Sequence, residues 1–135
     1  MHIKSIIIGY ILTFIVFLLV DMFWLVVIAK NIYQKYLGGF LSGSVNWPAA
    51  FIFYLIYIVG ISIFAIYPAV NKNSALNALL MGALFGIFTY ATYDLTNLAT
   101  LKGWPLPIVF IDIAWGAVLS GLVSFAGFHI VKWIN

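Results

Sequence analysis

The sequence predicts an all-α membrane protein in which four transmembrane helices form a single domain over residues 1–135. Of the 135 residues, 66% are hydrophobic and only 7% are charged, and the mean hydropathy is +1.19. Soluble domains carry about 25% charged residues, so the composition alone indicates a membrane protein. Four apolar runs reach the length of about 20 residues that a spanning helix needs. They cover residues 5–29, 48–70, 74–101 and 105–131.

The first apolar run predicts a retained helix and not a cleaved secretory signal. It continues to Ala29 without an A-x-A pattern, whereas the apolar stretch of a signal spans about 7–15 residues and ends at a small-residue cleavage site. The connection that follows, "KNIYQKYLGGFLSGSVNW" (residues 30–47), mixes aromatic residues with lysines and glycines. This composition fits a segment at the membrane interface, and an ordinary loop is the alternative.

An even number of helices places both termini on one side of the membrane. The positive-inside rule does not choose that side, because each side carries three lysines. Those on the terminal side are Lys4, Lys72 and Lys132, and those on the other side are Lys30, Lys35 and Lys102.

The two halves of the chain share a weak pattern that suggests a two-fold internal repeat of helices 1–2 and 3–4. The first helix ends "DMFWLVVIAK" and the third ends "DLTNLATLK", and a Trp-Pro pair opens each following helix. Tryptophan at the interface and proline at the first helical position are also favoured without any repeat. Both explanations therefore stay open.

All three acidic residues lie inside predicted helices and in the same half of the bilayer. At a rise of about 1.5 Å per residue, Asp21 lies about 13 Å from the surface near Lys30. By the same rise, Asp94 lies about 12 Å and Asp112 about 10 Å from that side. A charged side chain at the bilayer centre costs at least ~2.5–3.5 kcal/mol, so we expect the three carboxylates to face the interior of the bundle.

Helical spacing connects these aspartates with small and polar residues. Side chains four residues apart share one face of a helix, and small residues on such a face let two membrane helices approach closely. The predicted packing residues are Gly82, Gly86, Gly116, Ser120 and Ser124. The predicted polar cavity is formed by Asp21, Trp24, Tyr90, Asp94, Thr96, Asn97, Thr100, Asp112 and Trp115. Trp24 and Trp115 each follow an aspartate by three residues, which favours tryptophan–aspartate hydrogen bonds between helices.

Composition and missing motifs exclude several functions. Without cysteine there is no thiolate chemistry. Without arginine there is no bidentate clamp for a diphosphate, which weakens the case for a prenyl- or phosphatidyl-transferase without excluding it. No basic stripe exists for nucleic acid, no familiar catalytic motif is present, and no cofactor or metal ligand is assigned.

Three hypotheses remain for the aspartates. The first is a cavity that binds or transports a small cation, a proton-coupled solute or an amphiphile, since intramembrane ionisable residues indicate functional sites. The second is a component of membrane-lipid modification, with Asp94 or Asp112 as general acid or base. The third is a scaffold in which the aspartates only fix helix register.

The strings "VDMFWL", "NWPAA", "GALFGIFTYATYDLTNLATLKGWP" and "DIAWGAVLSG" resemble a known family over nearly the full length. The chain is similar to the bacterial membrane proteins grouped as domain of unknown function 2177. The resemblance implies a multi-pass protein of the bacterial cytoplasmic membrane with lipid neighbours, and it assigns no catalytic residue. Genes of this family often lie beside genes for fatty-acid-modifying enzymes, so the resemblance points toward lipid chemistry. A homo-oligomer is a further expectation.

Overall fold

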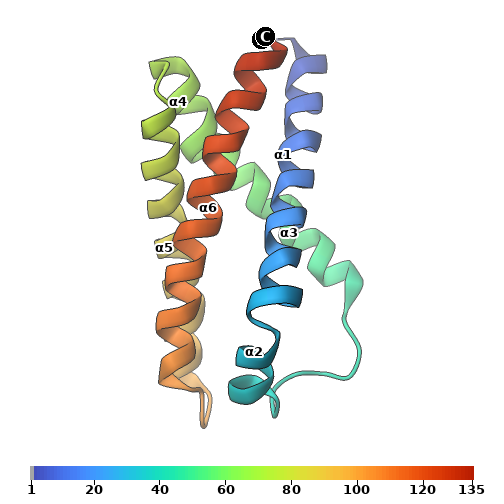
Figure 1. The fold of residues 1–135 in the computed structure, drawn as a ribbon, viewed down its shortest axis with the longest axis vertical. Coiled ribbons are helices and arrows are strands. Elements are labelled where there is room, and N and C mark those ends of the chain that lie inside the picture. Colours follow the sequence, from blue (N-terminus) through green and yellow to red (C-terminus); the bar gives the residue numbers. More distant parts are fainter. Residues whose placement is uncertain (1) are drawn as a thin grey trace.

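The chain folds into a bundle of helices, as seen in the computed structural model, which describes residues 2–135 (Figure 1). Helix α1 (Ile3–Phe23) continues into a π-helix, η1 (Trp24–Ile28), and α2 (Lys30–Leu37) follows. The next continuous stretch consists of α3 (Trp47–Ile61), the π-helix η2 (Ser62–Ile66) and α4 (Tyr67–Lys72). The last two helices are α5 (Ala75–Thr100) and α6 (Leu106–Ile134).

Four helical stretches are long and apolar enough to cross a membrane. They are Ile3–Ile28, Trp47–Lys72, Ala75–Thr100 and Leu106–Ile134. The prediction of an all-helical chain with four long apolar helices is therefore confirmed. Local signals fix several helix boundaries: the Asn46 side chain accepts a hydrogen bond from the Ala49 amide, and Ser74 caps α5 through the Asn77 amide. Asn73, with a φ of 50°, ends α4 in the left-handed region.

Helices α5 and α6 form the tightest pair in the bundle and run antiparallel, side by side (Figure 1). Small residues make this approach possible, because a Cβ on Gly86 would collide with the Gly116 carbonyl oxygen. Gly82 lies in the same way against Ser120 and Ser124. We call this contact the α5–α6 seam.

Helix α1 completes a compact part of the bundle by packing on α6, and Gly9 lies against Val131 and Ile134. The main apolar core joins α1, α3, η2 and α6, and its buried residues are Phe17, Tyr57, Ile58, Ile61, Ile66, Leu119, Val123 and Val131. Helix α3 is steeply inclined to the other helices (Figure 1). It packs against α1, whereas the η2 segment that follows packs against α5.

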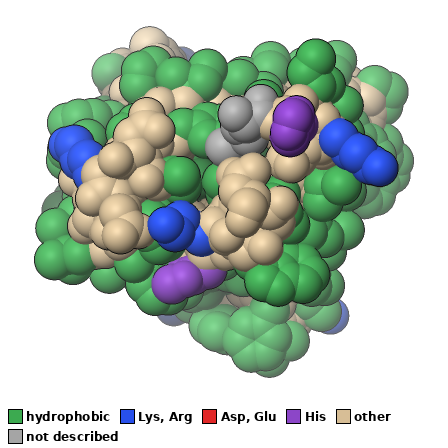
Figure 2. Space-filling model, turned by 90° about the horizontal axis from the view of Figure 1, so that it is seen from above, with side chains coloured by type: hydrophobic (Ala, Val, Ile, Leu, Met, Phe, Trp, Pro, Cys, Tyr) green, Lys and Arg blue, Asp and Glu red, His purple; other side chains and the backbone are tan. Residues whose placement is uncertain are grey.

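The outer surface is apolar, as lipid requires, and the acids are inside. Large apolar side chains such as Ile7, Leu19 and Phe88 are exposed on different helices. Asp21, Asp94 and Asp112 are only 8%, 0% and 7% exposed. Seen from above, the end of the bundle carries lysine and histidine side chains and displays no aspartate (Figure 2).

We expect Gly86→Ala to destabilise the protein by about 1–3 kcal/mol, the usual cost of overpacking a tight interface. The added methyl group would meet backbone atoms of Gly116, which cannot rotate away as a side chain would. Unfolding in detergent, followed by circular dichroism, measures the effect. Gly43→Ala is the matched control, because nothing lies within 4 Å of its added Cβ. Equal stability of the two variants would contradict a tightly packed seam.

Candidate functional site

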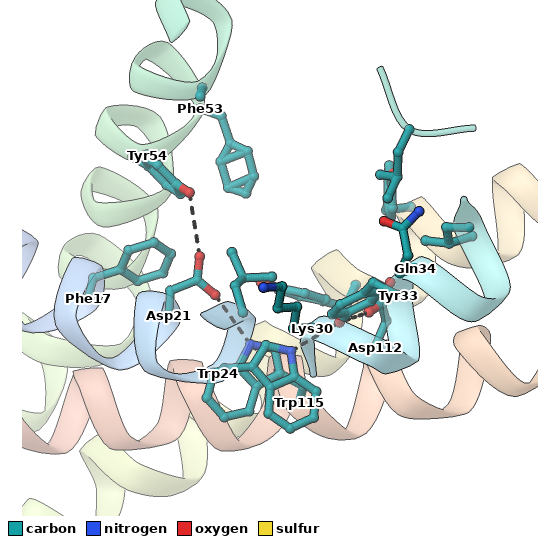
Figure 3. Close-up of a pocket in the computed structure, with 16 residues that line it drawn as sticks. Phe17, Asp21, Trp24, Lys30, Tyr33, Gln34, Phe53, Tyr54, Asp112 and Trp115 are labelled. Atoms are coloured by element: carbon teal, nitrogen blue, oxygen red, sulfur yellow. Dashed lines mark hydrogen bonds between the residues drawn. The ribbon is translucent and has the colours of Figure 1, made fainter. Parts of the chain in front are cut away.

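A cavity of about 450 Å³ opens at the α2 end of the bundle, and its polar lining comes from separate elements (Figure 3). Helices α1, α3 and α6 contribute two carboxylates, a tyrosine and an indole, whereas η1 and α2 contribute a second indole, a tyrosine, a lysine and a glutamine. These polar and aromatic residues, with those of α5, are Asp21, Trp24, Lys30, Tyr33, Gln34, Tyr54, Tyr90, Tyr93, Asp112 and Trp115.

Asp21 projects from α1 between two hydrogen-bond donors on other helices. The Trp115 indole of α6 donates to one carboxylate oxygen at 3.4 Å, and the Tyr54 hydroxyl of α3 donates to the other at 3.5 Å. Both distances exceed the usual 2.7–3.2 Å for N–H donors and 2.5–3.0 Å for O–H donors. A carboxylate accepts about four hydrogen bonds, so Asp21 retains acceptor sites that face the cavity.

Asp112 on α6 is held by a chain of hydrogen bonds that begins in η1. The Trp24 indole donates to the Tyr33 hydroxyl at 3.1 Å, and this hydroxyl donates to Asp112. Burial raises the pKa of Tyr33, and the hydrogen bond to Asp112 raises it further. Tyr33 is therefore a neutral donor over the whole physiological range.

The two stacked indoles connect the hydrogen bonds of Asp21 with those of Asp112. Trp24 and Trp115 are stacked, with ring centroids 4.4 Å apart and planes 8° from parallel. In Figure 3 they lie between Asp21 and Asp112. Each tryptophan is hydrogen-bonded to the aspartate that is distant in sequence. Trp115 donates directly to Asp21, and Trp24 donates to Tyr33, which in turn donates to Asp112. Sequence spacing favoured tryptophan–aspartate contacts between helices, and Tyr33 was not among the predicted site residues.

Asp94 lies on α5 behind the cavity and not in its lining. Neither of its carboxylate oxygens has a hydrogen-bond donor among the described residues. Its side chain faces Asp112 and the Trp104 indole, which also lacks a conventional acceptor within residues 2–135. Asp94 is the one predicted site aspartate outside the cavity wall, and it contacts the wall through Asp112.

The remaining predicted residues of α5 are distributed around the helix. Tyr90 lines the cavity, whereas Asn97 is half-buried outside it. Thr96 and Thr100 are exposed, and the Thr100 hydroxyl donates to the Thr96 carbonyl. Two and six residues beyond Asp94 correspond to rotations of about 200° and 240°, which turn both threonines away from the seam. The structure thus does not bring them to the cavity.

A π-helix positions the side of the cavity that sequence reasoning missed. In η1 the Ala29 amide donates a hydrogen bond of 2.7 Å to the Trp24 carbonyl, five residues earlier in the chain. This turn therefore holds one residue more than a turn of α-helix. Such turns are frequent at functional sites. Directly after it, α2 presents Lys30, Tyr33 and Gln34 to the cavity. The signal available in the sequence was the run of tyrosine and lysine in residues 30–47.

An apolar groove of about 680 Å³ adjoins the cavity between α3 and α5. Phe53, Tyr90 and Tyr93 line both spaces. The rest of the groove is formed by Ile56, Tyr57, Gly60, Phe64, Phe85 and Thr89. The inclination of α3 away from α5 explains why this gap exists on the outer surface.

The three carboxylates do not share one space, since Asp21 and Asp112 line the cavity and Asp94 lies outside its lining. Among residues 2–135, no group of three or more histidine, cysteine or acidic side chains is placed to hold a metal ion. The predicted polar residues are divided between the cavity, the seam and the exposed face of α5.

Together these features define a multi-pass membrane protein with buried aspartates among its helices. The family model described as "Predicted membrane protein (DUF2177)" matches residues 6–129, and the chain belongs to this family. The resemblance noted in the sequence is confirmed. Neither a curated protein nor a solved structure matches the chain significantly.

Replacing Tyr33 by phenylalanine should destabilise the protein by about 1.5–3 kcal/mol, the usual contribution of a hydrogen bond to a charged group. The change removes the donor to Asp112 and the acceptor for Trp24. Tyr36→Phe, on the same helix, is the matched control. Thermal unfolding in detergent measures both variants, and equal losses would contradict a specific role for Tyr33.

The stability difference between the wild-type protein and Tyr33→Phe should depend on pH. The pKa of Tyr33 is raised above its ordinary value of 10.0, so the folded protein holds this proton more tightly than the unfolded chain does. The Tyr33 hydroxyl therefore contributes fully to the free energy of unfolding below pH 10, and this contribution declines as the pH rises further. Wild-type protein should therefore lose stability above pH 10 more steeply than Tyr33→Phe, with parallel curves below. Identical slopes above pH 10 would refute this assignment.

Proposed function

We propose that the protein binds an amphiphile taken laterally from the bilayer, with the polar end in the cavity and the apolar chain in the groove. The observation that carries this proposal is the continuity of the two spaces through Phe53, Tyr90 and Tyr93. Ligand pockets typically enclose about 300–1,000 Å³ and combine an apolar lining with a few polar groups. Each of the two volumes falls within that range.

The lining favours a polar end that donates hydrogen bonds. Asp21 offers free acceptor sites, and Asp112 faces the same space. An amine or a hydroxyl group of the ligand can donate hydrogen bonds to these two carboxylates, whereas a carboxylate on the ligand would be repelled by them. Lys30 lies on the lining as well and limits the net negative charge of the cavity.

The groove supports an apolar chain as its occupant. It lies between spanning helices, where the surrounding solvent is hydrocarbon, and most of its lining is aromatic or aliphatic. The apolar chain of a lipid can therefore enter the groove without leaving the bilayer. Its polar end then gives up hydrogen bonds to water and forms hydrogen bonds with the cavity wall. This path requires no opening of the α5–α6 seam.

The same proposal includes a membrane topology. In this topology all four candidate helices span the bilayer and both termini lie on one side, which is supported by the contact of Gly9 in α1 with Val131 and Ile134 in α6. Family membership and the resemblance to bacterial proteins support a place in the bacterial cytoplasmic membrane.

Lipid modification is a second candidate, and one contact favours it. Asp112 lines the cavity and also faces the buried Asp94, so a carboxyl pair lies beside the proposed position of the polar end. Such pairs can act as general acid and base. Altered lipid in a reconstituted assay, and not binding alone, distinguishes this candidate.

Photolabelling tests the binding proposal. Alkyl amphiphiles carrying a diazirine in the chain and an amine, hydroxyl or carboxylate head are irradiated with the protein in liposomes. The labelled residues are then mapped by mass spectrometry. We expect the amine and hydroxyl probes to label the groove segments 53–64 and 85–93. Labelling spread evenly over the outward residues of α1, such as Ile7 and Ile11, would refute a defined site.

A matched pair of variants controls this experiment. Ile56 lines the groove and is 67% exposed, whereas Ile63 on the same stretch is 55% exposed and lies outside the lining. Ile56→Trp should reduce groove labelling several-fold by filling the space, and Ile63→Trp should leave it unchanged. Equal labelling of the two variants would contradict occupation of the groove.

A further inference from the structure

We infer that Asp94 and Asp112 together bind one proton, held between their carboxyl groups behind the cavity wall. Asp94 carries the proton and donates it to the Asp112 carboxylate. This proton site is separate from the proposed amphiphile site and does not depend on it.

The register of the α5–α6 seam brings the two carboxyl groups face to face. A Cβ on Gly82 would meet Ser124, a Cβ on Gly86 would meet Ser120, and a Cβ on Gly116 would meet Tyr90. In each of these antiparallel pairs the two residue numbers sum to 206. The next pair in this series, four residues along each helix, is Asp94 with Asp112.

No donor among the described residues stands in hydrogen-bond geometry with the Asp94 carboxyl group. The side chain is fully buried, and both oxygens lack a donor among the described residues. The groups that face it are the Asp112 carboxyl of α6, the Trp104 indole and the Tyr93 hydroxyl of its own helix. None of these carries a positive charge.

A shared proton resolves this arrangement. Two adjacent ionised carboxylates repel each other, and a proton between them replaces the repulsion by a hydrogen bond. It also provides the buried Asp94 with the partner that buried polar groups require.

The hydrogen bonds determine which carboxyl group is neutral. Asp112 already accepts a hydrogen bond from Tyr33, which stabilises its ionised form. Asp94 faces the neutral Trp104 indole, but this donor is not in hydrogen-bond geometry with either carboxylate oxygen. The proton therefore resides on Asp94, and Asp112 is the acceptor. The proton therefore lies one hydrogen bond behind a residue that lines the cavity.

Infrared spectroscopy tests this proposal directly, because a protonated carboxyl group has a C=O stretching band that an ionised carboxylate lacks. The wild-type protein is measured at neutral pH in a detergent without carbonyl groups, in H₂O and in D₂O. We expect one protonated-carboxyl band that shifts to lower frequency in D₂O. Asp is the only acidic residue type in the chain, so carbon-13 labelling of aspartate must shift the band too.

Two variants assign the band to its residue. Asp94→Asn should abolish it, since the amide donates to Asp112 without a titrating proton, and Asp21→Asn should retain it. A band lost with Asp21→Asn, or kept in Asp94→Asn, would overturn the assignment. The wild-type spectrum decides the question even if a variant does not fold, because no protonated-carboxyl band at neutral pH would overturn the proposal.

Discussion

Hydrocarbon supplies no hydrogen-bond partners, and this constraint determines where every polar side chain inside the bundle lies. The three aspartates avoid the lipid surface, and two of them are bound by donors from three other elements. The interaction that makes this possible is the α5–α6 seam. Its glycines bring the two backbones together and set the register that aligns Asp94 with Asp112. A shifted register would leave a carboxyl group facing an apolar partner.

The seam also explains why the cavity and the groove are where they are. Helices α5 and α6 are closely packed, and the cavity and the groove lie where the inclined α3 and the short α2 approach them. The polar cavity is closed by α2 on the side of the connecting segment, and the groove opens toward lipid between α3 and α5. The closely packed α5–α6 pair and the inclined α3 therefore leave two adjoining spaces, one with two carboxylates in its lining and one with a mainly apolar lining.

The sequence predicted the features that depend on composition and on regular helical spacing. Four apolar runs specified four long helices, and the four-residue spacing placed Gly86, Tyr90 and Asp94 on one face of α5. The features that it did not reveal depend on irregular backbone or on tertiary geometry. The π-turn of η1 has no period to detect, and it brings Tyr33 and Lys30 to the cavity. The inclination of α3, which brings Tyr54 to Asp21, depends on packing between helices distant in sequence.

Each aspartate of the cavity depends on a tryptophan from the other end of the chain, and this has a consequence for synthesis of the chain. Asp21 enters the membrane with the first helix, but its indole donor is 94 residues further along the chain. Asp112 is inserted last and relies on Trp24 and Tyr33, which are already in place. During translation Asp21 can therefore gain the Tyr54 hydroxyl of the second span first, and its indole donor only when the fourth span has emerged. A chain that lacks the final helix therefore leaves Asp21 with the Tyr54 hydroxyl as its one donor of the two seen here.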